Sequence, residues 1–342
     1  MAARHFKSHD PLLHGAPFDD HKIQNVLRTY ALEAIDTFDL PKDCAVRPIT
    51  ISENASILLS SPKDSASWVL RIHRSNYHSQ NSILSEVAWV EAIAKSTQVI
   101  VPHFRRTTNQ QPVVTLASYG PRFAVLTRLI EGQHLVEPAE LREFETVGAI
   151  AGELHRLSRA WRPPKGFFRF SWDLNSGIGE NARWGSWRRA PLDASAYNVV
   201  ERACSKLSTV LANRVGDPRH WGLIHADMRS ANLLAIEQGR ALIDFDDCGY
   251  SWYLYDLATA VSFFEHAPEV ETWVERWIEG YQQYAQLTKD DRQAIWPLIV
   301  YRRLVLVGWS ISHQTTSTAG GLDEDFLDQT VELCNRYLLS RS

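Results

Sequence analysis

The spacing of apolar and polar positions divides the chain into two parts of different character. Up to residue 129, apolar residues fall mainly into short runs rich in β-branched and aromatic side chains, which are typical of strands. Strands are predicted at residues 46–50, 56–59, 68–73, 113–117 and 123–129, and a long helical period covers residues 79–95. We therefore expect a small antiparallel sheet with one helix against it.

From residue 130 onward, apolar positions mainly repeat every three or four residues, as in amphipathic helices. Helices are predicted here at residues 140–157, 197–213, 270–285, 289–312 and 325–339. One further helix is predicted near the start of the chain, after Asp20, which is a suitable N-cap. The Pro- and Trp-rich residues between them, 161–191, are expected to form loops or a flap. The predicted fold class is α+β, with an N-terminal arm at 1–24, an N-lobe at 25–129 and a mainly helical C-lobe at 130–342.

Two short apolar runs inside the helical part are predicted to form a β-hairpin. Residues 233–236 and 241–243 are separated by Glu-Gln-Gly-Arg, a short polar connection that contains glycine. Antiparallel pairing would place Asn232, at the start of the first strand, beside Asp244, at the end of the second. The alternative is a hairpin with ordinary polar ends.

Polar residues around this hairpin have the spacing of a magnesium-dependent phosphoryl-transfer site. His225, Asp227, Asn232 and Asp244 follow the pattern H-x-D-x4-N-x11-D. One carboxylate can orient or deprotonate an attacking hydroxyl, while an amide oxygen and a second carboxylate hold the cation on the phosphates. An Asn and an Asp without a Cys or His partner fit magnesium better than zinc.

Composition argues against several other classes of protein. The 36 basic and 40 acidic residues are nearly balanced, which argues against bulk electrostatic binding of nucleic acid. The four cysteines form no C-x-x-C pair, which suggests reduced thiols in a cytoplasm and no zinc site. No secretory signal is visible at residues 1–20, and Arg302 and Arg303 interrupt the apolar run at 296–309, which argues against a membrane span.

The chain lacks the motifs of several other enzyme classes. The chain has no G-x4-GK[ST], H-E-x-x-H or G-x-S-x-G motif, so we do not expect a P-loop ATPase, a zinc protease or a serine hydrolase. Residues 177–182 fit G-x-G-x-x-A, but no βαβ pattern surrounds them, and dinucleotide binding is not expected.

The motifs HADMRSANLL and LIDFDDCGYSWYLYDLA, together with the sheet-plus-helix lobe and a short hinge, resemble the aminoglycoside phosphotransferase and choline kinase family. This family is a branch of the protein-kinase-like fold, and the resemblance covers about residues 25–340. SENASILL, WVLRIHRSNYHS, SEVAWVEAI and YRRLVLVGWSISHQT are most similar to the bacterial branch of type II homoserine kinases and stress-response Ser/Thr kinases. The resemblance implies a bilobal fold with ATP and Mg²⁺ as cofactors.

The resemblance also implies roles for residues of the C-lobe. Asp227 would be the catalytic carboxylate that faces the acceptor hydroxyl, and Asn232 and Asp244 would ligate magnesium. His225 would brace the catalytic loop, and Asp256 would anchor that loop structurally through backbone hydrogen bonds. Arg229 could neutralise charge on the transferred group, although a solvated surface arginine is an equal alternative.

In the N-lobe, the resemblance places Arg71 where the family often has a lysine that holds the nucleotide phosphates. Glu86 would be its helix partner, but arginine need not reproduce the same ion pair, and Arg74 is an alternative cation. The loop that would cover the phosphates, residues 52–56, ends at Ser56 and contains no glycine.

The adenine base would meet the hinge that follows the last strand of the N-lobe. Thr127, Leu129 and Ile130 would present backbone groups to the adenine edge. Ile72 and Leu129 would form apolar walls, with ordinary core packing as the alternative.

Acidic and aromatic residues follow the second metal ligand. Asp246, Asp247, Trp252, Tyr253 and Tyr255 suit a cationic amine that carries a hydroxyl, unless the aromatic rings simply pack the lobe. We expect ATP-dependent phosphorylation of a small amino alcohol, a homoserine-like or an aminoglycoside-like metabolite. A stress-response type Ser/Thr protein kinase and a non-catalytic nucleotide-binding module are the alternatives. The expected partner is a small-molecule hydroxyl acceptor, and we expect neither nucleic acid nor a membrane as a partner. Whether the chain forms a homodimer is left open.

Overall fold

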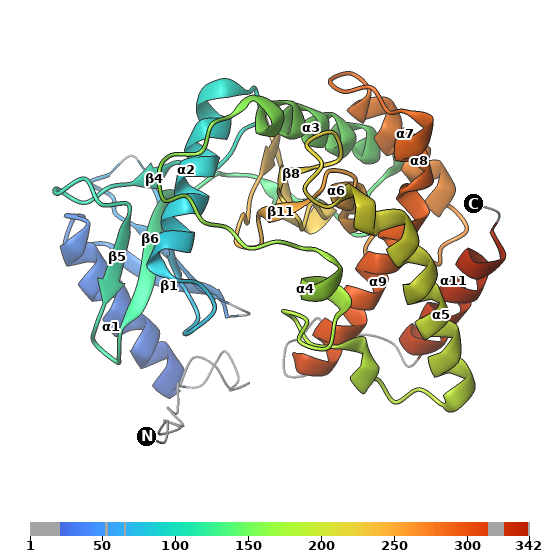
Figure 1. Ribbon diagram of the computed structural model, residues 1–342. Helices are drawn as coiled ribbons and strands as arrows, with labels where there is room; N and C mark the ends of the chain where they lie inside the picture. The colour runs from blue at the N-terminus through green and yellow to red at the C-terminus, as the bar shows by residue number, and fades with distance from the viewer. Residues whose placement is uncertain (1–20, 52–53, 65, 314–324, 341–342) are drawn as a thin grey trace. The chain divides into compact units, whose positions relative to one another are not determined.

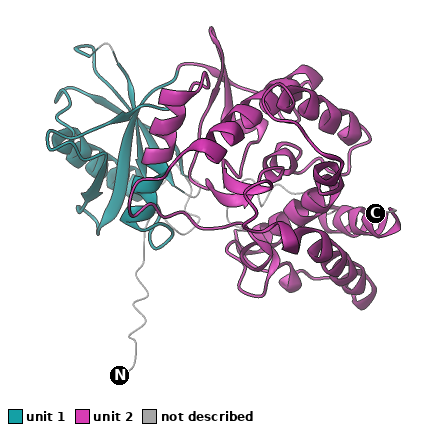
Figure 2. Ribbon diagram, turned by 45° about the horizontal axis from the view of Figure 1, so that its top comes forward, with its two compact units in different colours: residues 1–87, 102–130 teal, residues 88–101, 131–342 magenta. Residues whose placement is uncertain are grey.

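The computed structural model describes residues 21–51, 54–64, 66–313 and 325–340. The chain divides into two compact units, one formed by Met1–Val87 and Pro102–Ile130, the other by Ala88–Val101 and Glu131–Ser342 (Figure 2). The N-cap expected at Asp20, most of the N-terminal arm, and Ser52 and Glu53 of the phosphate-covering loop lie outside the described residues.

The first unit contains an antiparallel sheet. In its described part the strand order is β1-β2-β3-β6-β4, and β5 also pairs with β6 (Figure 1). The strands are β1 Ala45–Ile51, β2 Ala55–Ser60, β3 Trp68–Ile72, β4 Phe104–Arg105, β5 Val113–Leu116 and β6 Arg122–Arg128. The pattern missed β4, which has only two residues and therefore shows no period.

Helices cover both faces of this sheet. Successive side chains of a strand point to opposite faces, so neighbouring residues pack against different helices. Leu126 packs on the side of helix α1 (His21–Thr37), whereas its neighbour Val125 packs against Ile83 of helix α2 (Gln80–Ser96). The expectation of one helix was therefore incomplete. The period of α1 predicts a helix but does not reveal what it packs against.

The second unit is mainly helical. Its helices are α3 Leu141–Ala160, α4 Leu174–Ile178, α5 Ala194–Leu211, α6 Tyr255–Ala260, α7 Val270–Tyr281, α8 Lys289–Gln293, α9 Ile295–Ser312 and α11 Phe326–Leu339. Its strands are β7 Gln133–His134, β8 Trp221–Ile224, β9 Leu233–Ile236, β10 Gly239–Leu242 and β11 Gly249–Trp252. They form two small sheets, β10-β9-β7 and β11-β8. With the sheet of the first unit, this confirms the α+β fold class.

The predicted hairpin is present as β9 and β10, with Leu233 opposite Leu242. The pairing of β8 with β11 was not predicted, because each strand has four residues and its partner is distant in sequence. Residues 161–191 are mostly loop, as expected. Three of their four tryptophans, Trp172, Trp184 and Trp187, are buried, so these side chains belong to the core and not to an exposed flap.

Helix α9 runs through the core of the second unit. The helical segment Lys289–Ser312 is long and apolar enough to cross a membrane by length and composition, but 78% of its most apolar window is buried inside the protein. A core helix has the same apolar composition, and its burial here explains the composition without a membrane.

Candidate active site

The loop between β8 and β9 carries Asp227, and His225 connects this loop to the end of β10. The imidazole Nε2 of His225 donates to the carbonyl oxygen of Ile243 at 3.0 Å, and its Nδ1 accepts from the backbone N–H of Asp227 at 3.3 Å. His225 is fully buried. Its position suits bracing of the loop, the role that the resemblance implies.

Residues of helix α6 hold the loop backbone on both sides of Asp227. The carboxylate of Asp256 accepts from the backbone N–H groups of His225 at 3.2 Å and Ala226 at 2.7 Å. The hydroxyl oxygen of Thr259 accepts from the N–H of Met228 at 2.8 Å. Because these buried donors are all satisfied by one helix, the loop has one well-defined backbone conformation.

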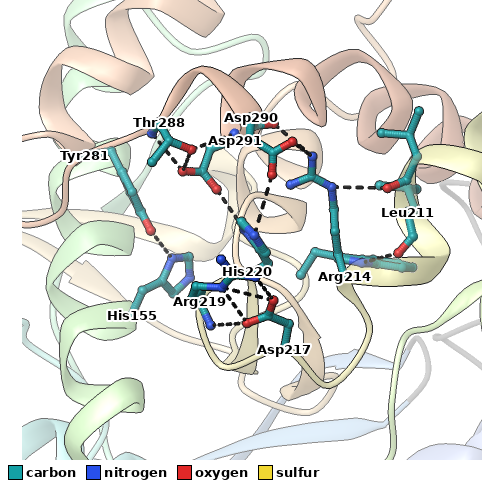
Figure 3. A network of polar contacts seen from close by, with 12 residues as sticks. His155, Leu211, Arg214, Asp217, Arg219, His220, Tyr281, Thr288, Asp290 and Asp291 are labelled. Carbon is teal, nitrogen blue, oxygen red and sulfur yellow. Dashed lines mark hydrogen bonds and ion pairs between the residues drawn. The ribbon is translucent and has the colours of Figure 1, made fainter.

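Asp256 is in turn held by a buried histidine of α3. The Nε2–H of His155 donates to Asp256 Oδ2 at 3.0 Å. Its Nδ1 accepts from the hydroxyl of Tyr281 at 3.2 Å (Figure 3). Burial lowers the pKa of His155, against the opposing effect of Asp256, and burial raises the pKa of Tyr281 to about 12. The ring is therefore neutral and the phenol protonated, as these two hydrogen bonds require.

The carboxylate of Asp227 is held at both of its oxygens. Oδ1 accepts from Nη2 of Arg302 at 2.6 Å, and Oδ2 accepts from Nδ2 of Asn232 at 2.9 Å. Burial alone would raise the pKa of Asp227, but the positive charge of Arg302, supported by Arg229, lowers it below its ordinary value. Asp227 is thus an oriented, ionised carboxylate whose side chain is 20% exposed.

The contact of Arg302 with Asp227 was not predicted, and Arg302 was cited by number only against a membrane span. A stronger signal was present, because a charged residue in the middle of an apolar core helix must find a partner. The pattern does not identify that partner, since Asp227 precedes Arg302 by 75 residues.

Asn232 and Asp244 lie at the open end of the hairpin, on its two strands' sides. The N–H of Ile243 donates to the carbonyl oxygen of Asn232 at 2.9 Å, so Asp244 follows the residue that lies opposite Asn232. The Asn232 amide nitrogen also donates to the carbonyl oxygen of Asp227 at 2.8 Å. Asp244 is exposed and its φ is 63°.

This donor set fits a magnesium ion that is also bound by phosphate. The nitrogen of the Asn232 amide donates to Asp227, so the amide oxygen is the atom of this side chain that could ligate a metal. Together with the Asp244 carboxylate it supplies hard oxygen ligands. In the part of the chain that the structure describes, no group of three or more His, Cys, Asp and Glu residues could hold a metal by itself. Magnesium commonly takes few protein ligands and completes its shell with water and phosphate.

Arg229 forms an ion pair with Glu137. Its Nε and Nη2 donate to the two carboxylate oxygens of Glu137 at 3.2 and 2.5 Å, and its guanidinium lies 4.7 Å from the ring centre of Phe263. With a side chain 18% exposed, it is not a solvated surface arginine, and its role in neutralising charge on the transferred group stays a prediction.

In the first unit, Arg71 of β3 forms an ion pair with Glu86 of α2. The Glu86 side chain is 1% exposed and that of Arg71 is 16% exposed, so the charge of arginine partly reaches solvent. Ser56 lies opposite Arg71 in the β2–β3 pairing. The alternative cation, Arg74, stacks on Tyr77 with its guanidinium 3.4 Å from the ring centre.

The predicted hinge follows the end of β6. The N–H of Leu129 donates to the carbonyl oxygen of Ser67 at 2.8 Å, so this donor is used within the unit. Thr127 pairs with Val69 in the sheet, and Leu129 and Ile130 are partly exposed. Ile72 is 1% exposed and packs in the core with α1, which favours ordinary core packing, the alternative to its role as an apolar wall of the nucleotide site.

The candidate substrate residues differ in exposure. Trp252 and Tyr255 are buried, and the indole N–H of Trp252 donates to the carbonyl oxygen of Leu211 at 3.1 Å, which favours the packing interpretation. The hydroxyl of Tyr255 accepts from Arg302. Asp246 is buried, whereas Asp247 is partly exposed.

Comparison with known proteins identifies the chain's relatives. It is 34% identical to a microcompartment-associated aminopropanol kinase, over 91% of this chain and 97% of that one, with a TM-score of 0.83. Amicoumacin kinase from Bacillus subtilis is 22% identical over 86% of this chain and 88% of its own length. The structure of a spectinomycin phosphotransferase bound to ADP and spectinomycin shares the fold, with a TM-score of 0.61 and 11% identity over 91% of this chain and 98% of that one.

Residues 46–294 match the profile of the phosphotransferase enzyme family, APH. The predicted family is thereby confirmed, whereas the finer placement beside homoserine kinases and stress-response kinases stays a prediction. The chain belongs to the APH phosphotransferase enzyme family and is a phosphotransferase with an alcohol group as acceptor.

Proposed function

We propose that this enzyme transfers the γ-phosphoryl group of ATP to the hydroxyl of a small amino alcohol, with magnesium as the metal ion. The observation that carries the proposal is the arrangement of Asp227, Asn232 and Asp244 on one loop and one hairpin end. The 34% identity to an aminopropanol kinase supports an amino alcohol as acceptor. The use of ATP is supported by the structure of amicoumacin kinase in complex with AMP-PNP and Ca²⁺, which shares the fold with a TM-score of 0.72.

Each residue has a distinct task in this proposal. Asp227 accepts a hydrogen bond from the acceptor hydroxyl and orients its oxygen for attack on phosphorus. The Asn232 amide oxygen and the Asp244 carboxylate would hold magnesium, which when bound neutralises charge on the phosphates. Arg71, kept in place by Glu86, would bind phosphate oxygens through its fork of N–H groups.

We assign the ammonium group of the acceptor to Asp247. An amino alcohol is short, so the carboxylate that binds its nitrogen must lie near the one that binds its hydroxyl. The negative charge of Asp247 acts on Tyr255 and Arg302, the pair that adjoins Asp227. Asp247 is also partly exposed, whereas its neighbour Asp246 is buried.

A panel of acceptors tests the proposed reaction. The enzyme is incubated with ATP, Mg²⁺ and either short amino alcohols, diols of the same length, or a protein with exposed Ser and Thr residues, and products are identified by ³¹P NMR and mass spectrometry. Phosphorylated amino alcohol is expected. Transfer to protein alone would favour the Ser/Thr kinase alternative, and binding of ATP without any transfer would favour the non-catalytic one.

Asp247→Asn tests the ammonium site. Loss of a charge-assisted contact is worth roughly 1.5–3 kcal/mol, so kcat/KM for the amino alcohol should fall roughly 10- to 100-fold. KM for ATP should stay the same, and a diol of the same length provides the control because it carries no ammonium group. An equal loss for amino alcohol and diol would contradict the assignment.

The compartment that we propose is the cytoplasm. All four cysteines are free thiols, as expected in a reducing compartment, and ATP is available there.

A further inference from the structure

Arg302 is a fully charged group in the core of the second unit. It lies in the middle of helix α9 and its side chain is 1% exposed. Burying a guanidinium is unfavourable unless its charge is paired and its N–H groups are bonded. The partners of Arg302 therefore indicate why the charge is kept in a helix that is mainly apolar.

All three guanidinium nitrogens of Arg302 have partners. Nε donates to the hydroxyl oxygen of Ser262 at 2.9 Å, and Nη1 donates to the hydroxyl oxygen of Tyr255 at 3.3 Å. These two neutral groups leave Nη2 for Asp227 Oδ1, at 2.6 Å. Because the guanidinium is planar and rigid, fixing two of its nitrogens also fixes the direction of the third.

The contact controls the orientation of the Asp227 carboxylate. Arg302 holds Oδ1 from α9, and Asn232 holds Oδ2 from the start of the hairpin. With a bond at each oxygen, the carboxylate plane cannot rotate freely. The remaining lone pairs then face one direction, which is the condition for aligning an acceptor hydroxyl.

We propose that Arg302 is a positioning residue, which acts on the reaction by holding the Asp227 carboxylate in its productive orientation. This inference depends on the proposed function of Asp227. Arg302 itself need not contact the acceptor or the nucleotide. The alternative is that Arg302 only stabilises the packing of α9.

The next residue of the helix provides a matched control. Arg303 is also 1% exposed, and its nitrogens donate to Glu265 Oε2 at 2.8 Å, Thr330 Oγ1 at 2.8 Å and the carbonyl oxygen of Phe326 at 2.9 Å. It has the same burial and a comparable set of partners, but its carboxylate is Glu265 and not Asp227. A purely structural role predicts that substitutions at the two positions behave alike.

The first experiment compares Arg302→Gln, Arg302→Lys and Arg303→Gln in steady-state kinetics and thermal unfolding. Arg302→Gln should lower kcat roughly 10- to 100-fold, as loss of a group that orients a catalytic ligand does, without raising KM for ATP. Arg302→Lys should recover part of kcat because the charge returns. Arg303→Gln should lower the melting temperature but leave kcat per folded molecule unchanged. Equal loss of kcat in the Arg302→Gln and Arg303→Gln variants would overturn the proposal.

A double-mutant cycle separates positioning from general damage. If Arg302 acts through the Asp227 carboxylate, adding Arg302→Gln to Asp227→Asn should cause little further loss of kcat. If Arg302→Gln lowered kcat by the same factor in the Asp227→Asn background as in the wild type, the proposal would be overturned. Wild-type kcat in Asp227→Asn alone would instead remove the proposed function of Asp227, so the two failures are distinguishable.

A milder variant covers the case in which Arg302→Gln does not fold. Ser262→Ala keeps the guanidinium charge but removes the acceptor of Nε, which loosens the fork. A lower kcat with unchanged KM for ATP is expected, and this loss should vanish in the Asp227→Asn background. A wild-type kcat in Ser262→Ala would count against positioning.

Discussion

Single residues at the site adopt backbone conformations that most side chains avoid. Ala226 has a φ of 68° and Asp244 has a φ of 63°, both in the left-handed region. Such a conformation costs on the order of 1–3 kcal/mol for a residue other than glycine. Asp256 offsets this cost at Ala226 by accepting its N–H. Ala226 precedes the proposed catalytic residue Asp227, and Asp244 is itself a proposed magnesium ligand, so the strained backbone lies where two site side chains are oriented.

His155 makes the stability of the enzyme depend on pH. Burial lowers the pKa of its imidazole below the ordinary value of 6.5. Below pH 6.5 the unfolded chain gains a proton at His155 that the folded protein does not bind. The free energy of unfolding should therefore fall as pH decreases from about 6.5 toward the lowered folded pKa, by at most roughly 1.4 kcal/mol per pH unit for this one proton.

Urea unfolding at several pH values between about 5 and 7.5 measures this dependence. His155→Gln removes the titrating group, so its stability should be lower at neutral pH but should change less steeply with pH. The comparison with wild type isolates His155 from the other histidines. Parallel profiles of unfolding free energy against pH for the two proteins would show that His155 is not the origin of the pH dependence.

At the scale of elements, the close crossing of α3 and α7 brings His155 to Tyr281. An added Cβ at Gly148 would lie 1.9 Å from the carbonyl oxygen of Trp277, and one at Gly280 would lie 1.9 Å from that of Glu145. Only glycine allows the two backbones to approach in this way. The crossing therefore supports Asp256, and through it the loop that carries Asp227.

Gly148→Ala should separate these helices and destabilise the protein by about 1–3 kcal/mol, the usual range for overpacking. Thermal unfolding measures the loss, and kcat should fall with it because His155 and Tyr281 move apart. Arg156→Ala on the same helix is the control, since that side chain is 60% exposed. An unchanged melting temperature in Gly148→Ala would show that the helices can adjust without cost.

At the scale of the whole molecule, the sequence predicted what short-range periods and motifs encode. The hairpin could be predicted because its strands and turn are contiguous, and its register alone places Asn232 near Asp244. The ion pairs of Arg302 with Asp227 and of Arg229 with Glu137 could not be predicted, because each joins residues more than 70 positions apart. A period shows which face of a helix is buried, but the partner of a buried charge depends on how the helices pack.

The response of the enzyme to magnesium and nucleotide follows from this arrangement. A ligand that binds only the folded state stabilises it by about 2.7 kcal/mol at a concentration one hundred times its Kd. ATP with Mg²⁺ should therefore raise the melting temperature, and EDTA should abolish both activity and the part of this shift that needs the metal.

Asp244→Ala should lose the metal-dependent part of the shift in melting temperature, because it removes a proposed oxygen ligand without changing the core. Glu237→Ala is the matched control, since Glu237 is exposed on the turn of the same hairpin and should leave the shift intact. A full magnesium-dependent shift in Asp244→Ala would show that the ion is held elsewhere.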